Sequence, residues 1–94
     1  MDDELRAALT AKGTKCKLQF PASVRDYFIK ECGFTDEELD VFMLRNRGKT
    51  VLQISFIMQE KYGPELPGGQ YSVGKVEARI RTIKKKILRV MTTE

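Results

Sequence analysis

The sequence predicts an all-α fold, a small helical bundle built around one core. The chain has 94 residues, of which 41% are hydrophobic, enough for a single domain and too few for a two-domain enzyme. Hydroxyl residues followed three positions later by an acidic or amide residue recur along it, and this pairing is typical of helix starts. Near the C-terminus, apolar residues recur at spacings of four, three and four, the period of an amphipathic helix.

The first predicted elements precede Phe34. A short helix is expected over residues 2–10 and an extended connection over residues 12–20. Ser23, with Asp26 three positions on, is expected to begin the next helix, and Gly33 to end it. We expect residues 1–33 to form an N-terminal helical extension packed on the same core as residues 34–94.

The next helix has the clearest start in the chain. Thr35 is placed as its N-cap, and Glu38 completes a capping box. Phe34 and Leu39 occupy the two positions of a hydrophobic staple around this cap. The helix is therefore expected to begin at position 36, and Gly48 is placed to stop it in a left-handed conformation.

A further helix is expected over residues 51–62. Thr50 and Gln53 repeat the capping-box pattern, and Gly63 with the following proline marks the end. Hydrophobic residues between positions 51 and 58 also alternate with period two, so a strand would fit this run. We favour the helix because both ends carry helix signals.

The last two elements are a loop and a long helix. Residues 63–70 contain two prolines and three glycines and are expected to form a loop. Ser72 is the next N-cap, and the helix that follows is expected to run to about Met91. Its buried stripe consists of Val76, Ile80, Ile83 and Ile87.

Composition excludes several classes of function. The chain has no histidine, and its two cysteines, Cys16 and Cys32, lack the spacing of a metal site, so we expect no metal, no cofactor and no enzyme activity. The longest uncharged run, residues 50–59, is far below the ~20 apolar residues of a membrane span. We expect a cytoplasmic protein that does not enter the membrane.

The basic residues concentrate at one end of the chain. Residues 1–71 carry ten basic and eleven acidic side chains, whereas residues 72–94 carry seven basic and two acidic. Like charges gathered on one element are typical of a surface that binds a polyanion. A solvated helix face would produce the same pattern.

Two runs of residues resemble a known DNA-binding family. From Phe34 and Thr35 through Gly48, Thr50 and Ile54, the chain resembles the start of a LuxR-type helix-turn-helix domain. After the loop, the N-cap serine and its apolar spacing are similar to the recognition helix of that family. Region 4 of bacterial sigma factors has a related layout.

The resemblance implies sequence-specific binding of double-stranded DNA by a small transcriptional regulator or sigma-like factor. The helix after Thr50 would be the scaffold, and the recognition helix, residues 73–91, would lie in the major groove. RNA polymerase and a second copy of the chain are the other partners that it implies, the latter through the last helix. This sequence departs from the family by an enlarged turn, residues 63–71, before the recognition helix.

A helical projection assigns roles within that helix. Gly74, Ala78, Arg81 and Lys85 lie opposite the buried stripe. Small residues permit a close approach to base edges, and Arg81 can donate to guanine. The candidate DNA-binding residues are Lys49, Thr50, Ser72, Gly74, Lys75, Glu77, Ala78, Arg81, Thr82, Lys84 and Lys85. Among them the lysines, together with Arg79, are expected at phosphates, and Glu77 at a cytosine amino group.

Each assignment has a structural alternative. The lysine run, residues 84–86, would also serve as a solvated face that complements the helix dipole. Glu77 would form an ion pair with Arg81 four residues on, and Gly74 would be a loose first turn without function. For the whole protein the main alternative is an interaction module whose basic helix docks on an acidic partner such as an RNA polymerase subunit. A membrane-surface helix is a third.

Overall fold

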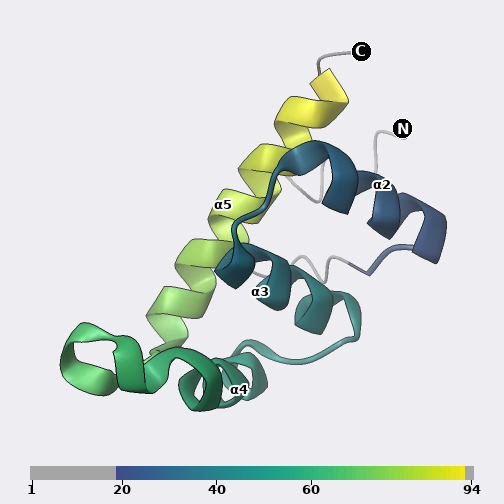
Figure 1. Ribbon diagram of the computed structural model, residues 1–94. Helices are drawn as coiled ribbons and strands as arrows, with labels where there is room; N and C mark the ends of the chain where they lie inside the picture. The colour runs from purple at the N-terminus through teal and green to yellow at the C-terminus, as the bar shows by residue number, and fades with distance from the viewer. Residues whose placement is uncertain (1–18, 93–94) are drawn as a thin grey trace.

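Four α-helices joined by short connections make up the part of the protein that the structure describes. The computed structural model describes residues 19–92. Its helices are α2 (Ala22–Cys32), α3 (Asp36–Asn46), α4 (Val51–Tyr62) and α5 (Val73–Thr92), with no strand among these residues (Figure 1). The predicted all-α class is therefore confirmed for this part of the chain. The helix expected over residues 2–10 and most of the connection that follows it lie outside the described residues.

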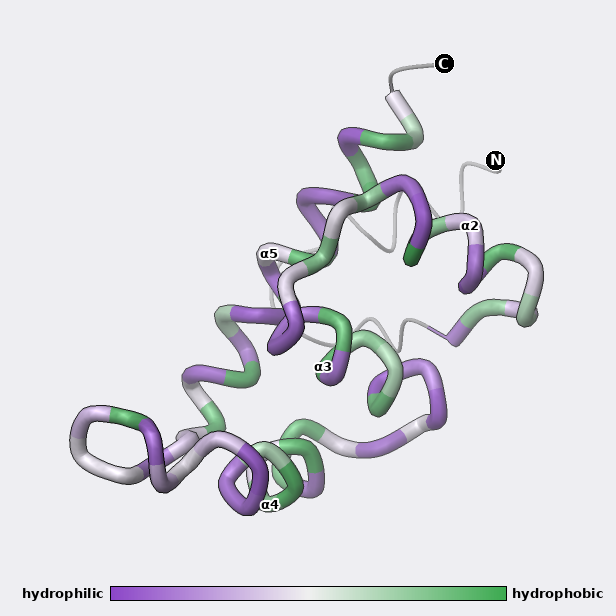
Figure 2. The backbone as a smooth tube through the Cα atoms, in the orientation of Figure 1, coloured by the Kyte–Doolittle hydropathy of each residue, from purple (hydrophilic) through white to green (hydrophobic). Residues whose placement is uncertain are grey.

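Helix α5 is the axis on which the other helices pack. It is 20 residues long, and α2, α3 and α4 all contact it. Figure 1 shows α4 at its N-terminal end and α2 beside its C-terminal half. Hydrophobic and hydrophilic segments alternate along α5 in Figure 2, as an amphipathic helix requires. The four residues of the predicted stripe, Val76, Ile80, Ile83 and Ile87, are completely buried.

The core collects two buried hydrophobic side chains from each of α2, α3 and α4 against this stripe. Phe28 of α2 and Phe42 of α3 are fully buried, and so are Ile54 and Met58 of α4. Cys32 also lies in this core, where burial raises the pKa of its thiol to about 11. The helix that precedes residue 33 thus shares its core with the helices that follow. None of the described helices combines the length and apolar composition that crossing a bilayer requires.

The predicted caps of α3 and α4 are confirmed. Thr35 Oγ1 accepts from Glu38 N at 3.3 Å, and Thr35 N donates to the Glu38 carboxylate at 2.9 Å. Thr50 and Gln53 make the same reciprocal pair at 3.1 and 2.9 Å. Left-handed backbone at Gly48 (φ 86°) follows α3, as expected from the sequence. The strand alternative for residues 51–58 is wrong, because these residues belong to helix α4.

The predicted start of α2 is wrong by two residues. The helix begins at Ala22 after Pro21, and no side chain caps it, so Ser23 lies inside the first turn. Proline has φ −56° here, already suited to a helix start, and its carbonyl accepts from Arg25 N at 2.9 Å. The predicted end is confirmed, since Gly33 adopts φ 64° directly after Cys32.

Candidate nucleic-acid interface

The outward face of α5 is the side that the helical projection predicted. Gly74, Arg81 and Lys85 are exposed and Ala78 is half-buried, whereas the residues on the opposite side are buried. Arg89 extends this face by one more turn, although the sequence reasoning omitted it. Its spacing of four from Lys85, which repeats the spacing of Lys85 from Arg81, is the sequence signal that places it on this face.

Arg81, Lys85 and Arg89, here called the basic stripe, carry unneutralised charge. None of the three forms an ion pair with any of residues 19–92. Like charges four residues apart on a helix destabilise it by roughly 0.2–0.5 kcal/mol for each pair. The free protein therefore bears a small repulsion along this face, which a bound anion would relieve.

The three lysines at residues 84–86 have three different surroundings. Lys84 is only 5% exposed, Lys85 belongs to the basic stripe, and Lys86 forms an ion pair with the Glu38 carboxylate. The predicted phosphate contact of Lys84 is therefore wrong, because its side chain is buried and does not reach the surface. Although burial alone would raise the pKa of Glu38, the hydrogen bonds from Lys86 and Thr35 lower it below its ordinary value.

Arg79 also turns inward, against the expected phosphate contact. Its Nε lies 3.0 Å from the Glu37 carboxylate of α3, and the same oxygen accepts from Tyr71 Oη at 3.2 Å. Burial, together with the nearby Glu37 charge, raises the pKa of Tyr71 to about 12. This cluster holds the first turns of α5 against α3, and it uses the Arg79 side chain in a contact within the fold.

The first turn of α5 has an unusual glycine. Ser72 Oγ accepts from Lys75 N at 3.2 Å, which confirms the predicted cap. At Gly74 the backbone is not left-handed, and a Cβ would meet only Ser72 Oγ, at an ordinary 3.8 Å. Neither packing nor conformation therefore requires glycine at this position. Lys75 Nζ lies 5.4 Å from the centre of the Tyr71 ring, a cation–π distance that still leaves its side chain partly exposed.

Of the remaining predicted residues, Glu77 and Thr82 are placed less favourably for reading bases, whereas Lys49 and Thr50 were predicted to contact phosphates. Glu77 and Thr82 are half-buried, and the Thr82 hydroxyl donates to the Ala78 carbonyl at 3.1 Å. Lys49 and Thr50 are exposed at the start of α4. The Thr50 hydroxyl oxygen accepts from Gln53 N in the cap of that helix, which leaves its O–H, like nearby backbone N–H groups and the lysine, able to donate to an anion at this helix start.

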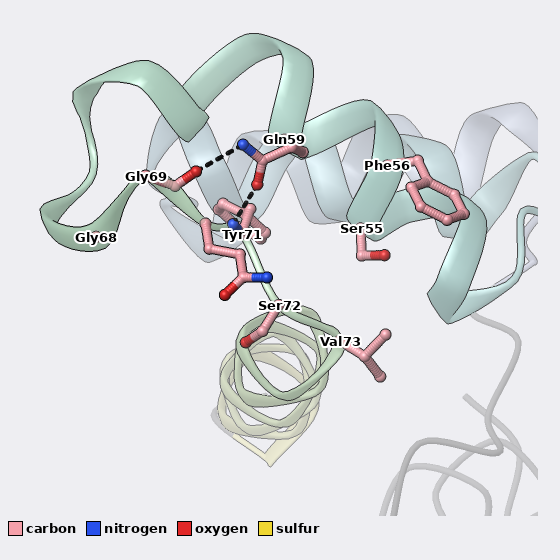
Figure 3. Close-up of a pocket in the computed structure, with 9 residues that line it drawn as sticks. Ser55, Phe56, Gln59, Gly68, Gly69, Tyr71, Ser72 and Val73 are labelled. Carbon is pink, nitrogen blue, oxygen red and sulfur yellow. Dashed lines mark hydrogen bonds between the residues drawn. The ribbon is translucent and has the colours of Figure 1, made fainter.

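The enlarged turn before α5 is held in place by one side chain. Gln59 of α4 donates to the Gly69 carbonyl at 2.8 Å and accepts from Tyr71 N at 2.5 Å (Figure 3). Two short 3₁₀ turns, Gly63–Glu65 and Pro67–Gly69, fold the chain between these helices. Because Gln59 binds the backbone on both sides of the last loop residue, it fixes where α5 begins. The sequence predicted the loop but not this bond, whose partners lie ten and twelve residues away.

An open cleft of about 740 Å³ lies between α4, this turn and the start of α5. Phe56 and Val73 stand on one side of it in Figure 3, and the loop glycines on the other.

Comparison with protein-family models, curated proteins and solved structures finds no match to this chain.

Proposed function

We propose that the protein binds double-stranded DNA through the outward face of α5, as a small helix-turn-helix regulator or sigma-like factor. One observation carries the proposal: the basic stripe. Two of the seven cations in the C-terminal quarter are neutralised by α3, and one is buried, yet the three on this face have no acidic partner among residues 19–92. A field of this kind attracts a polyanion.

The dimensions of α5 suit the major groove. A helix of 20 residues is about 30 Å long, and an α-helix fits the major groove of B-DNA. In the proposed complex the N-terminal half, with Gly74, Ala78 and Arg81, faces the bases. Lys85 and Arg89 lie farther along the helix and contact phosphates. Arg81 is the residue best suited to choose a sequence, because its guanidinium can donate to both acceptors of a guanine.

The order of the other helices supports the same proposal. Helices α3 and α4 are joined by a four-residue link and pack on α5, as the first helices of a helix-turn-helix domain would. The Gln59 bonds give the longer turn a defined geometry, so that α5 has a fixed orientation relative to the scaffold helix α4. Lys49 and the α4 N-terminus then supply further phosphate contacts.

The test is selection from a random duplex library, followed by titration of the selected duplex at several salt concentrations. About four phosphate contacts give an expected slope of log affinity against log salt of about −3.6. Arg81→Ala should weaken the selected site more than unrelated duplexes, whereas Lys85→Ala should weaken all duplexes alike. Lys30→Ala, which removes an exposed cation of α2, is the matched control and should change neither. A salt-independent affinity, or no enriched sequence, would contradict the proposal.

A further inference from the structure

Three of the four exposed large hydrophobic side chains of the described residues lie near one another, whereas the fourth, Ile57, lines a separate cleft between α3 and α4. Leu52, Phe56 and Ile57 of α4 are 56%, 64% and 39% exposed, and Val73 at the start of α5 is 37% exposed. Leu52, Phe56 and Val73 together present on the order of 300 Å² of apolar surface, about the size of the largest apolar patch on a typical monomer, which often has a function. None of these residues belongs to the basic stripe, so DNA binding does not account for them.

The patch combines a projecting ring with a cleft beside it. Phe56 is the most exposed of the four side chains and also lines the 740 Å³ cleft between α4 and the start of α5. Figure 3 shows its ring standing away from the helix, with Ser55 between it and the cleft. In a twofold pair the same surface meets itself, so it must contain both the projection and the cavity that receives it. This face meets that requirement.

The charges at the two ends of α4 indicate how a second copy would lie. Lys49 precedes the helix and Glu60 lies in its last turn, and both are exposed. They are too far apart to meet within one chain, because eleven residues of helix span about 16 Å. Neither forms an ion pair with any other residue in the 19–92 range. In an antiparallel pair of α4 helices, the lysine of each copy comes opposite the glutamate of the other.

We infer that the protein forms a symmetric homodimer through α4, in which two α4 helices pack antiparallel with Phe56 near the twofold axis. Pairing each Lys49 with the other copy's Glu60 places the twofold axis between residues 54 and 55, within two residues of Phe56, so the two rings lie close to each other across the axis. The apolar patch is smaller than the roughly 800 Å² that a stable interface buries on each partner. The polar rim around it must therefore contribute, and a dimer that dissociates in the micromolar range is expected.

This interface lies apart from the basic stripe and shares only Lys49 with the proposed phosphate contacts. Helix α4 packs on the buried side of α5, whereas Arg81 and Lys85 point away from it. The dimer would present two basic stripes, one from each copy, and neither would be covered. Its formation does not depend on whether the protein binds DNA.

The experiment is sedimentation equilibrium of the full chain, without DNA, from low micromolar to near-millimolar concentration. The wild type should show a monomer–dimer equilibrium, and Phe56→Gln should be monomeric while keeping its helical circular dichroism. Lys49→Glu and Glu60→Lys should each weaken the dimer about tenfold, and the double variant should restore it. Lys30→Gln, which changes an exposed cation of α2, is the control and should leave the equilibrium unchanged.

Three results would overturn the inference: a wild-type monomer at every concentration, a Phe56→Gln variant that still dimerises, and a double charge reversal that fails to restore association. Growth beyond the dimer would also overturn it, since that requires two different surfaces. Binding to the selected duplex, measured in parallel, shows separately whether the proposed function holds.

Discussion

Replacement of Gly74 by alanine separates a structural role from a functional one. The residue is exposed in the first turn of α5, and the added methyl would meet only Ser72 Oγ at 3.8 Å. Alanine is favoured over glycine in a helix interior by up to ~1 kcal/mol, and it also restricts the unfolded chain. Because helix ends fray, we expect about half of that gain, ~0.5 kcal/mol. For a domain of this size the melting temperature should then rise by about 2–4 °C.

DNA binding should change in the opposite direction. If the backbone at Gly74 approaches the base edges, a methyl group occupies space that the complex needs. Overpacking of a close interface costs about 1–3 kcal/mol, so the affinity of Gly74→Ala should fall about tenfold, or ~1.4 kcal/mol. Gly74→Leu should lose more. Fluorescence anisotropy with the selected duplex gives the affinity, and thermal unfolding followed by circular dichroism gives the stability.

Two outcomes would refute this reasoning in different places. A more stable variant that binds DNA as well as the wild type would mean that no base edge comes close to Gly74. A less stable variant would mean that the position is not open, contrary to its surroundings in the free protein. Only increased stability combined with weaker binding supports the assignment.

Three further predictions concern the fold. Lys86→Met removes the partner of a buried carboxylate and should cost about 2 kcal/mol in urea unfolding at neutral pH. Since the folded-state pKa of Glu38 is lowered, its contribution is present above about 4.5 and lost as pH falls, so the difference from the wild type should shrink in acid; a constant difference would contradict the pairing. Ser72→Ala should cost ~1 kcal/mol through the lost cap, and an unchanged unfolding midpoint would argue against that cap. The hydrogen bond to Asp40 raises the pKa of Tyr62 to about 12, and burial raises the pKa of Tyr71 to about 12, so both should ionise near pH 12 in the folded protein. The stability that they contribute is then lost between about pH 10 and 12, because the unfolded chain ionises first. Tyrosinate absorbance that rises fully by pH 10 would refute this.

Local features of this fold were predictable because their causes lie within one turn of helix. The caps at Thr35 and Thr50 each involve a residue three positions away, and the structure has both. The buried stripe of α5 follows from its own period. At Ser23 the same reasoning failed, because Pro21 supplies a preorganised start that competes with a side-chain cap.

Contacts between helices were not predictable from one helix alone. A helical projection gives the direction of Lys84 but not what covers it, and this lysine is nearly fully buried. Lys86 and Glu38 are 48 residues apart, so no local spacing indicates their pairing. The exposure of Leu52 and Phe56 was not predictable either. A run of hydrophobic residues has the same sequence pattern whether its side chains pack in the core or lie on the surface.

The first turn of α3 explains how the charges of α5 are sorted. The negative charges of Glu37 and Glu38 lie in the first turn of α3, where they stabilise the helix through its dipole. Glu37 also pairs with Arg79 of α5, and Glu38 pairs with Lys86 of α5. Both cations therefore hold α5 against α3 and add little to the outward field. The unneutralised charge is left to the basic stripe alone. Substitutions at the two glutamates should accordingly loosen the packing of α5, whereas substitutions in the stripe should alter binding to a polyanion while leaving the fold intact.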